Sequence, residues 1–233
     1  MTTVEFFDQL DARIAKYDLL CHPFYKAWAA GELTREDLRD YARDYYHHVD
    51  AFPAYLEELC ARLGEGELRS AVMANMADEN GMEGFSGQPS VRHSDLWLDF
   101  VEGMGADRNM AGHQPVAEVS DLIDFFHETA RRRTPAEALT SFYAYESQVP
   151  RVAQEKSCGL REMYGANEKA CGYFTLHATA DIHHSKIWRH QLAKCLETDP
   201  NLADKALLAG ERTAIALWQA LDGIDRRRTA RAA

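Results

Sequence analysis

The helical pattern at residues 34–64 is one of the two longest in the sequence, and it strongly constrains the fold. Thr34 stands before a pair of acidic residues in the manner of a capping box, which favours a helix start. Pro53 predicts a kink within this helix. Apolar and aromatic side chains recur along the segment at helical spacing: Leu38, Tyr41, Tyr45, His48, Phe52 and Tyr55. A helix face that only filled a hydrophobic core would be mainly aliphatic, whereas this face carries aromatic rings and hydroxyl groups.

Helical patterns also fill the rest of the chain. Seven prolines and fourteen glycines are few for 233 residues, and this scarcity favours helices over sheets. Further helices are predicted at 3–19, from Pro23 to Gly31, and at 67–80, 93–103, 114–133, 134–159 with a bend near Pro150, 167–197 and 200–224. No repeat or long linker divides the chain. We therefore expect an all-α, single-domain bundle of about seven helices over residues 1–225, followed by a basic, flexible tail at 226–233.

Charge and cysteine content narrow the classes of function. The net charge of −11 argues against a general nucleic-acid binder, although short basic runs occur at 131–133 and 226–231. No long apolar run indicates a signal peptide or a membrane span. The five cysteines are scattered and form no CxxC motif, which favours reduced thiols in a cytoplasmic protein over a disulfide framework.

The segment 173–190 carries the clearest chemical signal. His177, Asp181 and His184 follow the spacing i, i+4, i+7, which places all three side chains within one narrow arc of a helix. Imidazole and carboxylate together suit divalent iron, manganese or zinc, whereas calcium or magnesium would favour oxygen ligands alone. Helices also carry such neighbours by chance, and His183 and His190 on the opposite side indicate an ordinary surface. Taken alone, the triple indicates either half of a metal site or a polar face.

Two glutamates on other helices extend this signal. Glu146 lies among aromatic and apolar residues, where a carboxylate is costly to bury unless a cation or a hydrogen-bond donor faces it. Glu79 lies near the end of its helix. Each alone has an ordinary explanation, a tyrosine-bonded carboxylate for Glu146 and a solvated helix end for Glu79. Inward acids and histidines from several helices, however, build the carboxylate-bridged di-metal sites of helical bundles. With His93, the candidate ligands number six: Glu79, His93, Glu146, His177, Asp181 and His184.

Several motifs in matching order resemble one family. HPFYKAW, YARDYYHHVDAFP, HSDLWLDFVEGMG, YAYESQVP and HATADIHH span nearly the whole chain. Their order resembles the CADD-type para-aminobenzoate synthases, a branch of the haem-oxygenase-like di-metal oxidases. That branch is distantly similar to the pyrroloquinoline-quinone synthesis protein PqqC and to TenA-type proteins. The resemblance implies a haem-oxygenase-like fold without haem, and it is compatible with a homodimer.

The resemblance also implies roles for particular residues. The family's ligands fall on the six residues named above, which would hold two divalent transition metals, iron with iron or iron with manganese. Dioxygen and an external reductant are the implied co-substrates, and the electron donor is unknown. Tyr25 corresponds to the tyrosine that supplies the para-aminobenzoate ring, and Lys156 to the donor of its amino group. Tyr41 and Tyr145 correspond to the family's accessory tyrosines.

Two positions qualify this assignment. The segment between Glu79 and His93 is longer than the family pattern, and its additional Glu83, four residues after Glu79, would compete for the metal if the helix continued past Gly81. His93 is preferred because HSDLWLDF matches the family context. Lys156 lies ten residues beyond Glu146, or ~15 Å along a straight helix, so its access to the site depends on a bend near Pro150 or on the distance between the metals and the ring. The alternative is that Lys156 is an ordinary surface lysine near a helix end.

The sequence is therefore compatible with three functions. The first is a di-metal oxygenase that makes para-aminobenzoate for folate biosynthesis from its own Tyr25, once per chain. The second is a related oxidase that acts on an external small molecule, with Tyr25 merely lining the pocket. The third is a non-enzymatic helical interaction protein whose metal site is structural or vestigial.

Overall fold

The protein is a bundle of α-helices. The computed structural model describes residues 1–82 and 91–232, and within these ranges it contains no β-strand. The elements are α1 (Thr3–Ala15), η1 (Leu19–Cys21), α2 (Pro23–Ala29), α3 (Arg35–Cys60), α4 (Glu67–Glu79), α5 (His93–Gly103), α6 (Ala117–Arg132), α7 (Pro135–Glu146), α8 (Val149–Glu162), α9 (Glu168–Thr198), η3 (Pro200–Leu202) and α10 (Ala203–Ala232). The all-α prediction is confirmed. The described residues form more α-helices than the seven or so expected, and the predicted 134–159 helix is two helices, α7 and α8. The short helix predicted from Pro23 is present as α2.

Local sequence signals set several helix starts. Thr34 and Thr134 both form the capping boxes that open α3 and α7, with Asp37 and Glu137 as their partners. Pro135 occupies the first turn of α7, where its missing N–H leaves no donor unpaired. Pro53 lies inside α3, which continues through it to Cys60.

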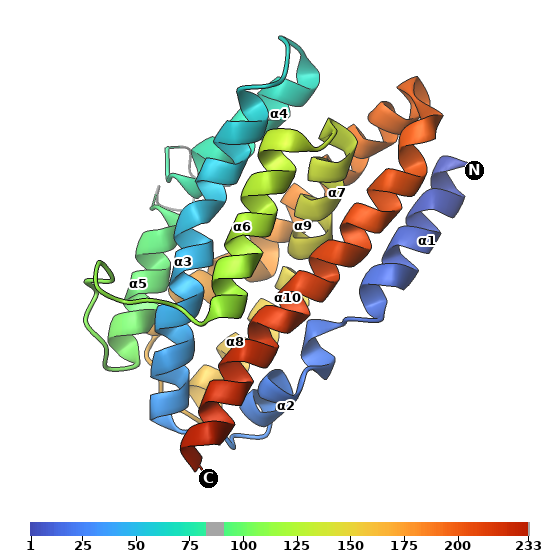
Figure 1. The fold of residues 1–233 in the computed structure, drawn as a ribbon. Helices are drawn as coiled ribbons and strands as arrows, with labels where there is room; N and C mark the ends of the chain where they lie inside the picture. Colours follow the sequence, from blue (N-terminus) through green and yellow to red (C-terminus); the bar gives the residue numbers. More distant parts are fainter. Residues whose placement is uncertain (83–90, 233) are drawn as a thin grey trace.

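The helix α9 is central to the bundle. It packs against α5, α7 and α8, while α7 also packs against α10 and α3 packs against α6. Figure 1 shows the long helices α3, α6 and α10 running beside one another, with α9 behind them. Residues on the inward faces of α9 and α7 are therefore removed from solvent.

Aromatic side chains join the helices around this centre. The buried indole of Trp97 on α5 donates its N–H to the carbonyl oxygen of Ala42 on α3 at 2.7 Å. Further along α3, the rings of Tyr55 and Phe126 stack with centroids 5.1 Å apart. The face of rings predicted along residues 34–64 is thus buried, and it joins α3 to α5 and α6.

The chain breaks between α7 and α8 instead of bending. α7 ends at Glu146, and Pro150 lies in the first turn of α8. Gln148 is buried at the break, where its side-chain N–H donates to the carbonyl of Ala144 and its oxygen accepts from the backbone N–H of Leu19. The break redirects α8, so the straight-helix separation of Glu146 and Lys156 does not apply.

The C-terminal segment differs from the predicted flexible tail. α10 continues past the boundary expected at residue 225 as far as Ala232, so residues 226–232 are helical. Arg231 pairs with Asp37 at 2.5 Å and with Asp40, and Arg227 pairs with Asp44 at 2.6 Å. These acids lie on α3, and the basic run therefore attaches the end of α10 to α3.

Two further expectations concern the whole chain. All five cysteines are free thiols, as predicted from their scattered positions. In the described part of the chain, the helices are too short or too polar to cross a bilayer.

Candidate metal centre

The centre begins where α4 ends. Gly81 follows the α4 C-cap with φ of 66°, the left-handed conformation that glycine adopts without strain. A Cβ at Gly81 would lie 2.5 Å from the carbonyl carbon of Val91, so only glycine lets these backbones approach so closely. This approach sets the start of α5 beside the end of α4. His93 thereby faces Glu79, with His93 Nδ1 2.8 Å from Glu79 Oε2.

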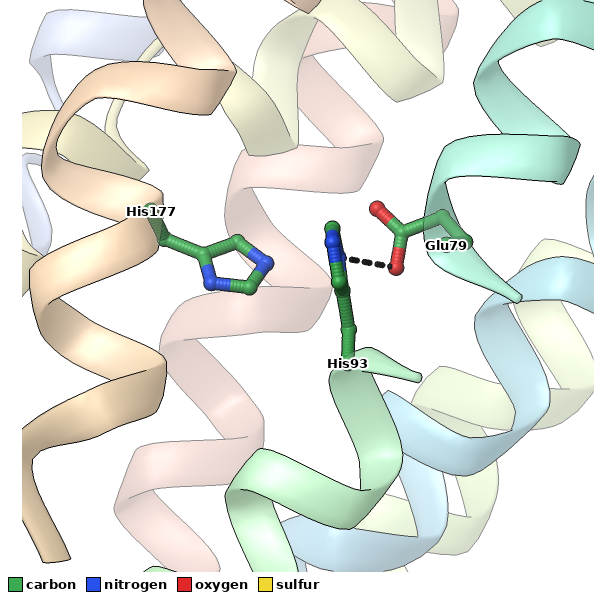
Figure 2. Close-up of side chains that lie close together, drawn as sticks. All are labelled: Glu79, His93 and His177. Carbon is green, nitrogen blue, oxygen red and sulfur yellow. Dashed lines mark ion pairs between the residues drawn. The ribbon is translucent and has the colours of Figure 1, made fainter. Parts of the chain in front are cut away.

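The six predicted ligand residues come together from four helices. Glu79 (α4), His93 (α5) and His177 (α9) form one buried triad whose potential ligand atoms all lie within 4.8 Å of one another. Figure 2 shows His93 between the Glu79 carboxylate and the ring of His177, which points in from α9. A second buried triad consists of Glu79, Glu146 (α7) and His184 (α9), and its potential ligand atoms also lie within 4.8 Å of one another. Glu79 is common to both triads.

Asp181 lies next to the second triad. Its Oδ1 is 3.3 Å from His184 Nδ1, and Glu146 Oε1 is 3.8 Å from the same nitrogen. His177, Asp181 and His184 are thus on one buried arc of α9, as their spacing indicated. Glu83 lies outside the described residues, so its competition with His93 stays a prediction.

The acidic and imidazole groups of this centre shift one another's pKa values. Burial by itself would raise the pKa of Glu79, but the neighbouring imidazoles of His93, His177 and His184 outweigh burial and lower that pKa to about 2. Burial raises the pKa of Glu146 well above its ordinary value, and the negative charges of Asp181 and Glu79 add to this effect. Burial opposes charge on His184 too, yet the adjacent carboxylates of Asp181 and Asp78 hold its pKa well above 6.5.

The centre contains the buried, unpaired atoms that a cation would satisfy. Within the described residues, Glu146 Oε1, Asp181 Oδ1 and His184 Nδ1 are buried and form no hydrogen bond. Such atoms are rare in folded proteins because each one costs desolvation energy. A donor set of three carboxylates and three imidazoles suits divalent iron or manganese. The residues present therefore fit two such ions, with Glu79 able to contact both.

Two residues that sequence reasoning missed contact these candidate ligands. The indole N–H of Trp188, one helical turn after His184, donates to Glu146 Oε2 and leaves Oε1 facing the centre. Asp78 Oδ2 lies 2.9 Å from His184 Nε2. The signals were present in the sequence, since Trp188 follows His184 by four residues and Asp78 adjoins Glu79.

A second polar cluster surrounds Lys156, which is buried and not a surface lysine. Its Nζ lies 2.6 Å from the hydroxyl oxygen of Tyr25 and donates a second hydrogen bond to the hydroxyl of Tyr41. The two tyrosine oxygens are 3.1 Å apart. Burial lowers the pKa of Lys156 well below its ordinary value and raises the pKa values of both tyrosines well above theirs. The buried cluster thus favours a neutral amine between two neutral phenols.

Two tyrosines lie between this cluster and the metal centre. Tyr145 and Tyr173 line the cavity that contains Tyr25 and Lys156, and they also line the cavity beside Glu79 and His177. The Tyr173 ring stacks on the His177 ring with centroids 3.8 Å apart. Tyr145 was predicted to be an accessory residue, whereas Tyr173 was missed, although it precedes His177 by one helical turn.

Comparison with known proteins assigns the class of protein that this fold and centre define. A family model described as iron-containing redox enzymes matches residues 39–219, so the chain belongs to that family. It is 36% identical to the 4-aminobenzoate synthase of Chlamydia trachomatis over 221 residues, which cover 94% of this chain and 91% of the relative. It is 34% identical to the 4-aminobenzoate synthase of Nitrosomonas europaea, with 96% and 92% covered. These relatives confirm the resemblance to para-aminobenzoate (4-aminobenzoate) synthases.

A solved structure supports the fold. A protein domain of unknown function from Shewanella denitrificans, with a heme oxygenase-like fold, superposes with a TM-score of 0.80 at 15% identity. The match covers 98% of this chain and 94% of that structure. The haem-oxygenase-like fold expected from the sequence is therefore confirmed.

Proposed function

We propose that this protein is an oxygen-dependent di-metal oxidase that produces 4-aminobenzoate for folate biosynthesis, with its own Tyr25 as the source of the ring and Lys156 as the amino donor. One observation carries the proposal: the buried amine of Lys156 lies 2.6 Å from the phenol of Tyr25, in a cavity that shares two lining residues with the metal centre. The similarity to named 4-aminobenzoate synthases supports the same product.

The metal centre would provide the oxidising power. Two divalent ions, iron with iron or iron with manganese, together with dioxygen and an external reductant, would supply redox chemistry when held by Glu79, His93, Glu146, His177, Asp181 and His184. The buried surroundings exclude bulk water from this centre. Trp188 fixes the orientation of the Glu146 carboxylate through its hydrogen bond.

The chain's own residues would prepare Tyr25 and Lys156 for reaction. The Tyr41 hydroxyl, 3.1 Å from the Tyr25 hydroxyl, holds the phenol in place. A neutral Lys156 keeps a lone pair on Nζ, which an amino donor requires. Because both groups are tethered to the same chain, neither pays the entropy of binding from solution. Tyr145 is proposed as the accessory tyrosine between the two cavities.

Use of Tyr25 as the ring source would consume the protein. Each chain would then turn over once, and its mass would fall as product appears. The deciding experiment loads the protein with iron and manganese, adds reductant and dioxygen, and follows both released 4-aminobenzoate and intact protein mass. With ring-labelled tyrosine in the chain, the label should appear in the product.

Matched variants identify the residues that react. The Tyr25→Phe and Lys156→Arg variants should release no 4-aminobenzoate. The intact mass of each variant should stay unchanged, because the side chain at residue 25 is not lost. Tyr17→Phe removes a partly buried phenol elsewhere and should behave as wild type. An unchanged wild-type chain beside a modified small molecule would instead support an oxidase with an external substrate. Wild-type protein that binds no transition metal would support a helical interaction protein.

A further inference from the structure

The last turn of α4 contributes two neighbouring carboxylates to different sides of the metal centre. Glu79 belongs to both triads, while Asp78 contacts the outer nitrogen of His184 on α9. Asp78 Oδ2 lies 2.9 Å from His184 Nε2, and the Asp78 side chain is 14% exposed. The opposite nitrogen, His184 Nδ1, faces Asp181 Oδ1 at 3.3 Å and Glu146 Oε1 at 3.8 Å. The imidazole is therefore held between an outer carboxylate and an inner group of unpaired acceptors.

We propose that Asp78 is a positioning residue that makes His184 bind a divalent ion through Nδ1 and that strengthens the site formed by Glu79, Glu146 and His184. This inference rests on the proposed di-metal function. An imidazole that binds a metal through one nitrogen carries its proton on the other. A carboxylate acceptor at Nε2 fixes that proton there and raises the basicity of the nitrogen that faces the ion.

The second imidazole on α9 has a different partner. His177 Nδ1 lies 2.8 Å from the backbone carbonyl oxygen of Tyr173, which leaves Nε2 of His177 for the first triad. A neutral carbonyl supports a histidine ligand less strongly than an anionic carboxylate. His177 and His184 should therefore use opposite ring nitrogens, and only the triad that contains His184 should depend on Asp78.

The distribution of charge supports a role beyond that of an ordinary helix-end acid. At the C-terminus of a helix the macrodipole disfavours a carboxylate, and both Asp78 and Glu79 lie in the last turn of α4. Glu79 lies 2.8 Å from His93, and Asp78 contacts His184. Each unfavourable carboxylate thus faces an imidazole of the centre.

The test compares Asp78→Asn with a carboxylate–imidazole pair outside the centre. Glu58 lies 2.9 Å from His127 Nδ1, and its side chain is 18% exposed against 14% for Asp78. Glu58 also pairs with Arg131, so Glu58→Gln alters a carboxylate–imidazole contact remote from the centre at a carboxylate of similar exposure. Cobalt(II) serves as the probe, because its absorption reports ligand geometry while elemental analysis counts the ions. The purified full chain is titrated without oxygen in the presence of a competing chelator.

We expect wild type and Glu58→Gln each to bind two cobalt ions, and the affinity of each site should be the same in both proteins. Asp78→Asn should keep one affinity unchanged and lose about 10- to 100-fold in the other, with a change in the absorption of that ion only. Equal binding of both ions by Asp78→Asn and wild type would overturn the role of Asp78 and leave the di-metal function standing. A wild type that binds fewer than two ions would count against both.

A measurement on the unaltered chain covers the case in which Asp78→Asn does not fold. In zinc-loaded protein labelled with ¹⁵N-histidine, the chemical shifts of each ring identify which nitrogen binds the ion. Coordination of His184 through Nδ1 and of His177 through Nε2 is expected. Coordination of His184 through Nε2 would overturn the inference, because Asp78 would then have to be displaced.

Discussion

Replacing Lys156 by methionine should change how the stability of the protein depends on pH. The lysine side chain is 5% exposed, and in the described residues its hydrogen-bond partners are two phenols, with no carboxylate among them. Burial therefore holds the pKa of Lys156 well below its value in the unfolded chain, about 10.4. Methionine has similar length and no charge to lose, so the variant lacks this linkage.

The sign and size follow from proton linkage. Between the lowered folded pKa and the unfolded pKa, the unfolded chain binds one proton more than the folded chain at residue 156. The free energy of unfolding of wild type should therefore rise with pH, relative to Lys156→Met, by about 1.4 kcal/mol per pH unit. Each pH unit within that interval adds the same increment to the difference between the two proteins. The lost hydrogen bonds and altered packing add an offset with little pH dependence of its own in this range.

Urea unfolding of both proteins at several pH values between 7 and 9 measures this slope. The other titrating groups are common to both chains, so the difference between them isolates residue 156. Lys205→Met, at an exposed lysine, should follow wild type at each pH. Parallel curves for wild type and Lys156→Met would show that Lys156 is charged in the folded protein. That result would refute both the reasoning from burial and the neutral amine of the proposed reaction.

Three further predictions concern the metal centre and its support. Glu79→Gln should weaken both metal sites, since Glu79 belongs to both triads, and elemental analysis that finds one site intact would contradict this sharing. Gly81→Ala should destabilise the protein by roughly 1–3 kcal/mol, because alanine is strained at φ of 66° and its Cβ would meet Val91; an unchanged urea midpoint would contradict the close approach. Lowering the pH from 7 to 5 should release bound metal, because the pKa values of Glu146 and His184 are raised and protons compete at both; metal retained through dialysis at pH 5 would contradict it.

Local sequence determined the helices and one edge of the metal centre. The capping boxes at Thr34 and Thr134 start α3 and α7 through contacts within four residues of chain. The periodicity of the α-helix alone places His177, Asp181 and His184 on one arc of α9. The carboxylates predicted on other helices and His93 completed the set of candidate ligands, and the structure brings them to that arc.

Tertiary structure decided the relations between helices. Only packing shows that Glu79 is common to both triads, and that Trp188 and Asp78 contact the outer sides of two candidate ligands. Lys156 faces Tyr25 because α7 ends at Glu146 and a new helix follows. Pro150 in the sequence predicted a bend near this position but not the end of the helix. Helix periodicity repeats every few residues and can be read locally. Burial, shared ligands and the choice of a ring nitrogen depend on side chains that meet from distant parts of the chain, and no local pattern encodes those distances.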